Sequence, residues 1–456
     1  MGDLIHDQSS PLMKSEIDLF TVPATQTIYD EGMWTTHFPI SSLDRNGPLE
    51  FHIVSSSDVF IDPANIYLET KCKIVGENNE PLNFERVTSD DDDTMVDNLP
   101  EIVTPINYFG ATQFKDLEVS LNNKVISTSD NMYAYRAFIE TLLTYSFNTK
   151  KTQLQMGFYY DDNYPGKDDN VVLANVQFED HKISNGNKIR WIKTRNSLPF
   201  QTYTKIHGDI FSQDRLLIGG TELRIKFTRA DPKFALISPS DDCKAKVSIE
   251  KAVLYVREQK VAPHVLLEYN KALLESTAKY PQKRVEMKYF TRSRDLSDLS
   301  ENSVCSGVLP RRIIFCMVNG ESFNGKFRSC PFKFQPCNIQ RAVLRVNGNA
   351  TPYSSIEFEP WAYNQGYASL MNSLGILGEN QEVGISLNAY ASNKFFLGFN
   401  LSSDMDIGNI FQPIKEGTVS LELKLSKSQD FSIVLIAYIE YDALLQIDAH
   451  GTVHQQ

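Results

Sequence analysis

The feature that most constrains the fold is a strand-and-turn pattern that occurs twice in the chain. It reads LEVSLNNKV at residues 117–125 and AVLRVNGNA at residues 342–350. In both segments apolar residues alternate with polar ones, and an Asn-Asn or Asn-Gly pair then reverses the chain, as in a β-hairpin. The pattern predicts either one β fold built twice or two unrelated β domains that share a hairpin by chance.

The residues around the two hairpins follow the same order in both halves. Each half has strands of alternating apolar and polar residues before the turn and an amphipathic helix after it. A strand that contains Gly-Thr near its start and a long apolar strand then end the half. The Gly-Thr strands are GGTELRIKF and EGTVSLELKLS, and the final strands are AKVSIEKAVLYVRE and SIVLIAYIEYDALLQI. This order favours a repeated fold: two tandem eight-stranded antiparallel β-sandwiches, each with one short helix.

Two segments have the spacing of an amphipathic helix. In SDNMYAYRAFIETLLTYSF an apolar stripe follows the capping candidates Ser129 and Asp130. In PWAYNQGYASLMNSLG the stripe lies between Pro360 at the start and Gly375 at the end. The stripes consist of Tyr135, Phe138, Ile139, Leu142 and Leu143 in the first half and of Tyr367, Leu370, Met371 and Leu374 in the second.

The chain is long enough for two cores. At 456 residues it exceeds the ~250–300 residues at which a single core usually stops growing. The predicted segments are an N-terminal arm (1–35), a first sandwich (36–260), a connecting segment (261–282) that we expect to be helical, a second sandwich (283–448) and a C-terminal tail (449–456). The first half has about 28 residues more between equivalent landmarks, and we place them in an exposed acidic loop at residues 159–170, with a second acidic loop at residues 89–98.

Charge and composition exclude several classes of protein. A formal net charge of −12 argues against a protein whose whole surface binds nucleic acid, because phosphates need clustered cations. The most apolar stretch ends at Glu440 after nine residues, far short of the ~20 of a membrane-spanning helix. The N-terminus has no signal-peptide pattern, so we expect synthesis inside the cell without one. The six cysteines, Cys72, Cys243, Cys305, Cys316, Cys330 and Cys337, are widely spaced, so we expect most of them to be free and buried.

The segment GESFNGKF (residues 320–327) fits part of a phosphate-binding loop. Such a loop needs a Ser or Thr hydroxyl for Mg²⁺ and a helix whose N-terminus faces the phosphates. Here Phe327 stands where the hydroxyl is needed, and Pro331 and Pro336 prevent a helix downstream. We therefore interpret the segment as a turn-rich loop without nucleotide binding.

No other pattern predicts a catalytic or metal site. The cysteine spacings are wider than the two to four residues of structural zinc sites, and the only His-x-x-x-His pair, His450 and His454, lies in the polar tail. No G-x-S-x-G nucleophile motif occurs, and Asp161 and Asp162 are expected to be solvated surface carboxylates. The prediction is a protein that is not an enzyme, with no catalytic, cofactor-binding or metal-binding residues and no cofactor.

One basic segment, KYPQKRVEMKYFTRSR (residues 279–294), has six cations against a single Glu286. It is either a surface that contacts phosphate backbones non-specifically or the solvated face of a strand. We prefer the second interpretation, because alternation with apolar residues is typical of a strand.

Four long segments resemble one protein family. They are KSEIDLFTVPATQT, GPLEFHIVSSSDVFIDPANIYLETKCKIV, the block from AKYPQKRVEMKYFT to LPRRIIFCMVNGESFNGKFRSCPFKF, and SIVLIAYIEYDALLQID. They are similar to the major capsid proteins of Maverick/Polinton elements and adintoviruses, from about Lys14 to Asp448. The acidic loops and the length of the first-half insertion depart from the family pattern.

The resemblance implies a mainly β, double jelly-roll capsid protein. Three chains would form a pseudo-hexagonal, hexon-like capsomer that tiles an icosahedral shell around double-stranded DNA. Implied partners are neighbouring capsomers, a single jelly-roll penton protein, minor capsid or cement proteins and, at most non-specifically, packaged DNA; the implied location is the virion. The alternative is a jelly-roll carbohydrate-binding or attachment protein, for which the tyrosines of YYDDNY (159–164) would form the binding platform. A cupin-like enzyme would need a His-x-His pattern, which the chain does not contain.

Overall fold

A computed structural model describes residue 8 and residues 14–43, 47–82, 102–162, 185–358, 362–408 and 410–455. The predicted acidic loop at residues 89–98 and most of the one at 159–170 lie outside these residues, as does Pro360.

The first half contains two four-stranded antiparallel sheets within the described residues. One has the order β1-β10-β3-β7, with β1 (Tyr29–His37), β10 (Lys246–Val261), β3 (Val59–Val75) and β7 (Phe200–Lys205). The other has the order β2-β8-β5-β6, with β2 (Leu49–Val54), β8 (Glu222–Arg229), β5 (Phe114–Leu121) and β6 (Lys124–Val125). A separate pair joins β4 (Thr104–Pro105) and β9 (Leu236–Ile237).

The second half repeats these two sheets. One has the order β11-β19-β13-β17, with β11 (Ala278–Arg292), β19 (Ile433–Ile447), β13 (Arg312–Asn319) and β17 (Leu397–Asn400). The other has the order β12-β18-β14-β15, with β12 (Glu301–Val308), β18 (Glu416–Leu425), β14 (Ile339–Val346) and β15 (Asn349–Ala350). Two short strands extend them: β20 (Val453–Gln455) pairs with β19, and β16 (Ile356–Glu357) pairs with β14.

The strand order is identical in the two halves. When the eight sheet strands of each half are counted along the chain, without the short β4, β9, β16 and β20, both halves have one sheet in the order 1-8-3-6 and one in the order 2-7-4-5. Two sheets of four strands that share one core form an eight-stranded jelly roll. The chain is therefore a double jelly roll, and the predicted fold class is confirmed.

The two Asn-type hairpins are the fourth and fifth strands of their halves. Asn122 and Asn123, and later Asn347 and Gly348, all have positive φ, as a two-residue type I′ turn requires. In both halves the first turn residue exchanges hydrogen bonds of 2.8–2.9 Å with the start of the seventh strand, Asn122 with Glu222 and Asn347 with Thr418. Glu222 therefore corresponds to Thr418. Relative to this bond, the Gly-Thr pair of the first half (Gly220 and Thr221) lies one residue earlier than that of the second half (Gly417 and Thr418).

The predicted alternation of apolar residues matches the burial of the strands. Leu49, Phe51 and Ile53 on β2, and Leu223 and Ile225 on β8, are at most 1% exposed, while their neighbours are solvated or half-buried. The same holds for β18, where every second residue from Val419 is buried. Period-two patterns therefore identified the strands with one face in the core.

The helices are more numerous than the one per half that we expected. The stripes lie on α2 (Tyr133–Thr144) and α8 (Asn364–Ser373), except Leu374, which is the C-cap of α8. The connecting segment contains α6 (Pro263–Glu275). Ser129 and Asp130 do not cap α2: Asp130 accepts from the Met132 amide, and Ser129 donates to Asp116. The other helices are α1 (Phe109–Thr112), α3 (Phe147–Lys151), α4 (Asn185–Thr194), α5 (Pro232–Ala235), α7 (Gly320–Asn324) and α9 (Leu387–Tyr390).

The predicted segment limits stay a proposal, and several strands do not follow them. Strand β1 lies partly within the segment assigned to the arm, because residues 29–37 pair with β10. Strand β11 begins at Ala278, inside the predicted connecting segment, and β20 forms in the predicted tail.

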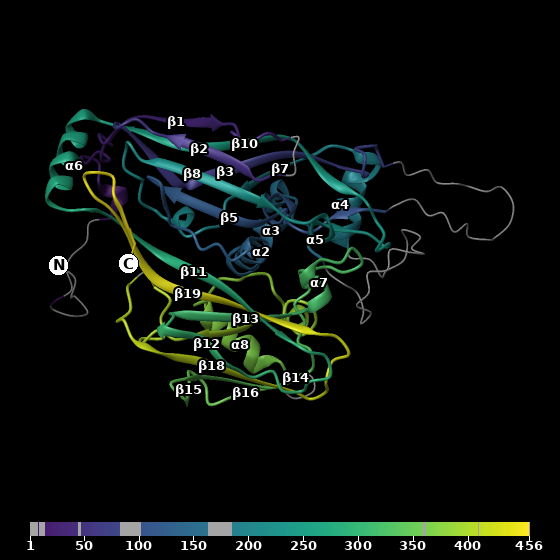
Figure 1. Cartoon of the computed structure of the whole chain (residues 1–456). Coiled ribbons are helices and arrows are strands. Elements are labelled where there is room, and N and C mark those ends of the chain that lie inside the picture. Colours follow the sequence, from purple (N-terminus) through teal and green to yellow (C-terminus); the bar gives the residue numbers. More distant parts are fainter. Residues whose placement is uncertain are drawn as a thin grey trace.

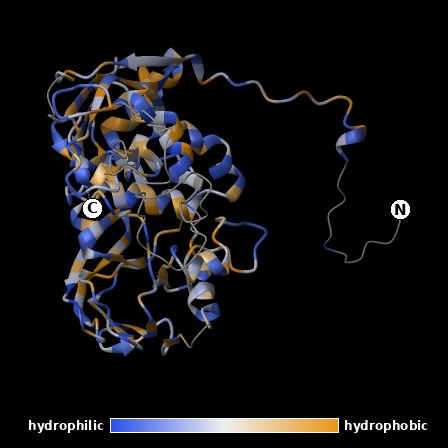
Figure 2. Cartoon of the chain, turned by 90° about the vertical axis from the view of Figure 1, so that its right-hand side faces the viewer, coloured by the Kyte–Doolittle hydropathy of each residue, from blue (hydrophilic) through white to orange (hydrophobic). Residues whose placement is uncertain are grey.

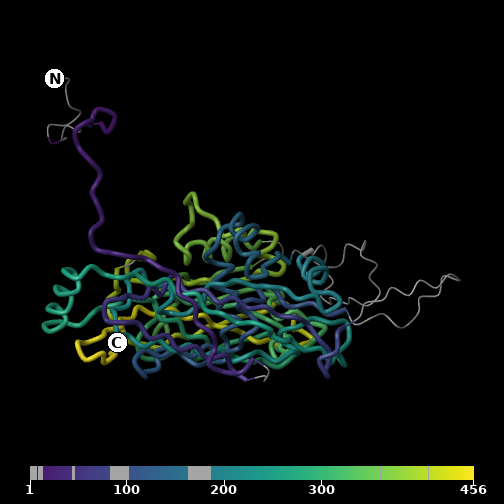
Figure 3. The backbone as a smooth tube through the Cα atoms, turned by 90° about the horizontal axis from the view of Figure 1, so that it is seen from above, coloured from purple at the N-terminus to yellow at the C-terminus, as the bar shows by residue number. Residues whose placement is uncertain are grey.

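The four sheets lie in layers, with the first half above the second (Figure 1). The described part of the arm runs away from the body (Figure 2). Its apolar side chains Ile17, Leu19, Phe20 and Val22 are exposed. The root of the arm, helix α6 and the C-terminus lie at the same end of the body (Figure 3). The arrangement puts α2 and the sheet β11-β19-β13-β17 at the boundary between the halves.

Candidate functional site

The most elaborate arrangement of side chains lies between the two halves. An aromatic cluster joins them: the Phe138 ring stacks on Phe332 with 4.2 Å between centroids, and Tyr135 stacks on Phe323 at 5.4 Å. Phe138 and Phe332 are buried in a hydrophobic core that extends through both jelly rolls. The two halves are thus packed into one body.

First-half side chains also cover the free edge of β11. Their hydrogen bonds reach backbone groups of alternate residues of that strand, which have no neighbouring strand on this side in the described part of the chain. The bonds are Thr128 to the Val285 carbonyl (3.3 Å), the Val285 amide to Asp209 (3.2 Å), the Met287 amide to Asp130 (3.3 Å), Gln213 to the Pro281 carbonyl (2.7 Å) and Arg215 to the Lys279 carbonyl (2.7 Å).

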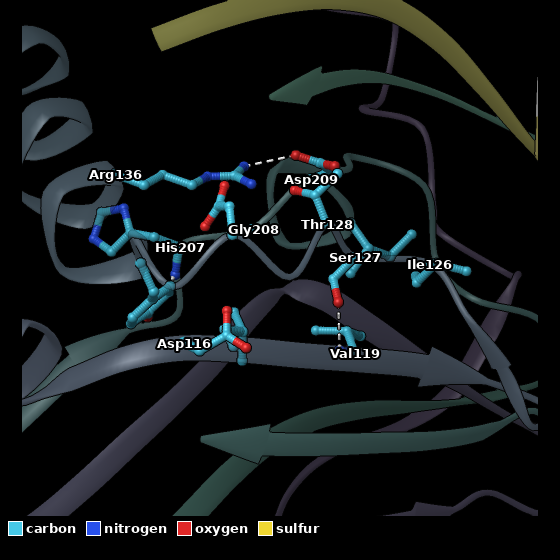
Figure 4. A pocket seen from close by; sticks show the side chains of 13 residues that line it. Asp116, Val119, Ile126, Ser127, Thr128, Arg136, His207, Gly208 and Asp209 are labelled. Carbon is cyan, nitrogen blue, oxygen red and sulfur yellow. Dashed lines mark hydrogen bonds and ion pairs between the residues drawn. The ribbon is translucent and has the colours of Figure 1, made fainter. Parts of the chain in front are cut away.

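A buried ion cluster lies beside this edge. Arg136 on α2 donates to Glu140 at 2.9 Å and to Asp209 at 2.6 Å. Glu140 also accepts from the Tyr438 hydroxyl of β19 at 3.3 Å, and His207 Nδ1 lies 2.8 Å from it. Tyr438 belongs to the second half, so the cluster spans the boundary. Figure 4 shows a small pocket next to it, with Arg136, His207 and Asp209 on one side and Asp116 of β5 on the other.

The carboxylates of this cluster respond differently to burial. Burial acts to raise the pKa of Glu140, but Arg136 and His207 outweigh it and hold that pKa at about 2. Burial raises the pKa of Asp209 above its ordinary value despite Arg136. Burial likewise acts against the charged form of Arg136, but Asp209 and Glu140 raise its pKa. Arg136 is therefore the cation on which the buried Asp209 and the partly buried Glu140 depend.

A second cluster lies across a solvent cavity of about 500 Å³ lined by both halves. Glu440 on β19 pairs with Arg312 and lies 3.6 Å from the Lys283 amine. Arg311 pairs with Asp442 at 3.1 Å. Burial acts to raise the pKa of Glu440, but Arg312 and then Lys283 outweigh it, so the pKa is lowered. All of these paired residues belong to the second half, so the pairs hold β11, β13 and β19 together beside the boundary.

The base of the predicted first-half insertion is also held by ion pairs. The fully buried Arg190 of α4 binds Asp162 at 3.0 Å, and Lys394 of the second half binds Asp161 at 2.7 Å. The interpretation of Asp161 and Asp162 as solvated surface carboxylates is wrong, because both are partly buried and paired. Their partners are distant in the sequence, which is why the local polar pattern was misleading.

Lys150 is a buried amine near the same place. It donates to the carbonyls of Leu142 and Val383 at 2.6 Å each, so it too joins the halves. Burial, and next the Lys394 cation, lower its pKa from 10.5 to about 7. The folded protein therefore loses this proton at a lower pH than the unfolded chain does.

The Lys150→Met variant is expected to lose part of the pH dependence of stability. Between pH 7 and 10.5 the unfolded wild type holds a proton that the folded protein has released, so stability rises with pH by up to about 1.4 kcal/mol per unit. Urea unfolding at pH 7, 8 and 9 measures this slope, with the exposed Lys151→Met as control. Equal slopes in wild type and Lys150→Met would contradict the assignment.

The phosphate-loop resemblance has no counterpart in the structure. Residues 320–324 form the one-turn helix α7, Gly325 reverses the chain with φ of 89°, and Lys326 pairs with Glu321 at 2.7 Å. Phe327 is buried. The segment is a helical turn and loop that packs against the first half, where the Ser238 amide donates to the Phe327 carbonyl.

The remaining predicted residues are placed as follows. All six cysteines are free and buried, as expected. Within the described ranges, no three or more His, Cys, Asp or Glu side chains gather as a metal site would require. Among those same residues, no helix is long and apolar enough to cross a membrane. Tyr159 is buried and Tyr160 half-buried, so these two tyrosines form no exposed binding platform; residues 163 and 164 lie outside the described part.

The basic segment lies on β11 and is only partly solvated. Lys283 pairs with Glu440, Arg284 with Glu286, and Arg292 with Glu301. Arg294, beyond the strand, is well exposed. The solvated-face interpretation missed that one edge of this strand is covered by the first half.

Comparisons with known proteins agree with the fold. No protein-family model matches the chain. An uncharacterized protein of Caenorhabditis elegans is 21% identical over 434 residues, which cover 94% of this chain and 97% of that protein. The chain is thus similar to that protein over almost its whole length.

Several solved viral structures have similar folds, among them these three. A chain of the Sputnik virophage has a TM-score of 0.66 at 9% identity, over 100% of this chain and 94% of that chain. The Faustovirus major capsid protein has a TM-score of 0.56 at 8% identity, over 96% of this chain and 93% of that chain. The mavirus major capsid protein has a TM-score of 0.52 at 11% identity, over 100% of this chain and 96% of that chain. At such identities the similarity establishes the fold, a double jelly roll that spans the whole chain.

Proposed function

We propose that the protein is a major capsid protein, a structural subunit without catalytic activity. The observation that carries the proposal is the duplicated strand order, 1-8-3-6 and 2-7-4-5, in one chain. The similar folds in viral capsid proteins cover that chain from end to end. The sequence resemblance to Maverick/Polinton and adintovirus capsid proteins supports the same function.

The duplication has a geometric use. Three copies of a two-domain chain present six similar domains around a threefold axis, so one subunit can occupy a hexagonal position in a shell. We infer a homotrimeric, hexon-like capsomer that tiles an icosahedral virion around double-stranded DNA. Its proposed partners are other capsomers, a single jelly-roll penton protein and minor capsid proteins, with at most non-specific contact to DNA.

The mass of the purified protein in solution tests this function. Three chains give 3 × 51.8 ≈ 155 kDa, and we expect this mass by light scattering together with a hexagonal outline in negative-stain images. A stable monomer of 51.8 kDa that binds glycans would instead favour the attachment protein.

A further inference from the structure

The contact between the two halves suggests how two chains meet. Within the chain, side chains from residues 209–215 of the first half cover the free edge of β11. These residues lie in the first-half loop (206–221), which joins the sixth and seventh strands of its jelly roll, and β11 is the first strand of the other. This part of the contact runs from the loop between strands six and seven to the edge of strand one, beside the bonds of Thr128 and Asp130 from the segment after strand five.

Among the described residues, the edge of β1 has no such cover, and the equivalent loop of the second half is largely exposed. The first strand of the first half, β1, also lies at the edge of its sheet, and its residues 29–34 are exposed. The second-half loop (401–408 and 410–415) joins the sixth and seventh strands of the second half. Because β1 belongs to the uppermost layer and the loop to the lower jelly roll (Figure 1), the two surfaces lie in different halves of one chain.

The face beside β1 has the character of a protein contact. Trp34 packs on Tyr67 of β3 with 6.0 Å between ring centroids, Tyr67 stacks on Tyr203 of β7 at 5.1 Å, and Tyr203 meets Tyr255 of β10 at 5.6 Å. These rings alternate with the buried core residues of their strands, so they lie on the face turned away from their own core. An aromatic row on an exposed face is typical of interaction surfaces.

The second-half loop is anchored by hydrogen bonds and presents apolar side chains. The buried Arg311 donates to the backbone carbonyls of Ile410, Asp406 and Gly408, while its partner Asp442 accepts from the Gln412 amide at 2.9 Å. Its exposed apolar residues are Met405, Ile410, Phe411 and Ile414. In the first-half loop the apolar residues Ile210, Phe211 and Leu217 are buried.

We propose that the second-half loop of one copy packs on the edge strand β1 and its aromatic face in the next copy. The inference rests on the proposed assembly of several chains and specifies its interface. It repeats between chains the contact that the chain already makes between its own halves. Such a head-to-tail contact closes into a ring when each copy is related to the next by a threefold rotation.

The charge variants Trp34→Asp and Ile414→Asp test the proposal. These side chains are 52% and 83% exposed, so the monomer is expected to fold, as checked by its thermal unfolding. Each variant is expected to fall from about 155 kDa to 51.8 kDa, because a buried carboxylate without a partner opposes the contact. The control Val54→Asp, on the other sheet of the first half, is expected to keep the full mass.

Mixing the two variants distinguishes this interface from a general loss of assembly. Trp34→Asp keeps an intact loop and Ile414→Asp keeps an intact β1 face, so the mixture is expected to form a two-chain species of 2 × 51.8 ≈ 104 kDa that neither variant forms alone. A wild-type trimer with trimeric variants would overturn this interface but leave the proposed function standing. A mixture that remains monomeric would overturn the head-to-tail contact, whereas a monomeric wild type would contradict the proposed function itself.

Discussion

Replacing Arg136 by methionine is expected to lower the free energy of unfolding by about 3–5 kcal/mol, because removing one partner of a buried ion pair leaves an uncompensated charge. Arg136 pairs with both Glu140 and Asp209, and neither carboxylate is well exposed. Methionine keeps the apolar stem, so the loss reflects the charge. Urea unfolding at neutral pH measures it.

The matched control is Arg345→Met. Arg345 pairs with Glu422 at 2.8 Å on the surface, with both side chains at least one-third exposed, and such a pair contributes about 0–1 kcal/mol. A loss for Arg136→Met no larger than that of the control would show that the cluster does not hold the halves together.

Replacing Phe138 by alanine is expected to cost about 3–5 kcal/mol, as for other buried phenylalanines. Its ring lies between the halves and stacks on Phe332. Because the core is continuous through both jelly rolls, we expect wild type and variant each to unfold in a single transition. Calorimetry and urea unfolding measure both quantities.

Phe38→Ala serves as the control, since Phe38 is 66% exposed and its loss should change stability by less than about 0.5 kcal/mol. Two separate transitions in the wild type, or a Phe138→Ala effect as small as that of Phe38→Ala, would contradict one continuous core.

The sequence predicted the parts of the fold that depend on local pattern. Leu223 and Ile225 alternate with charged residues because one face of β8 lies in the core. Asn347-Gly348 has the residues that a two-residue turn with positive φ requires. Because these signals occur in both halves, the repeat could be predicted before any strand pairing was known.

Elements without a periodic pattern were not predicted. Strand β12, ENSVCSGV, is mostly polar and exposed on one edge of its sheet, and β6 and β15 are two residues long. Their pairing depends on neighbours in the folded chain, which overrides local propensity.

The charged cluster between the halves was missed for a different reason. Arg136 and Asp209 are 73 residues apart, and Lys394 and Asp161 are 233 apart. Only the packing of the two jelly rolls brings these side chains together. One partner did have a signal in the sequence. Tyr438, whose hydroxyl donates to Glu140, lies in the most apolar stretch of the chain, and the charged Glu440 follows two residues later.

The central claim is that one chain supplies two equivalent jelly rolls to a six-sided assembly. A cryo-EM reconstruction of the purified oligomer, calculated without imposed symmetry, tests it most directly. We predict three chains around a threefold axis, six jelly rolls in a ring, and the second-half loop of each chain against β1 of the next. A monomer, a twofold dimer, or a ring with another number of jelly rolls would contradict the account.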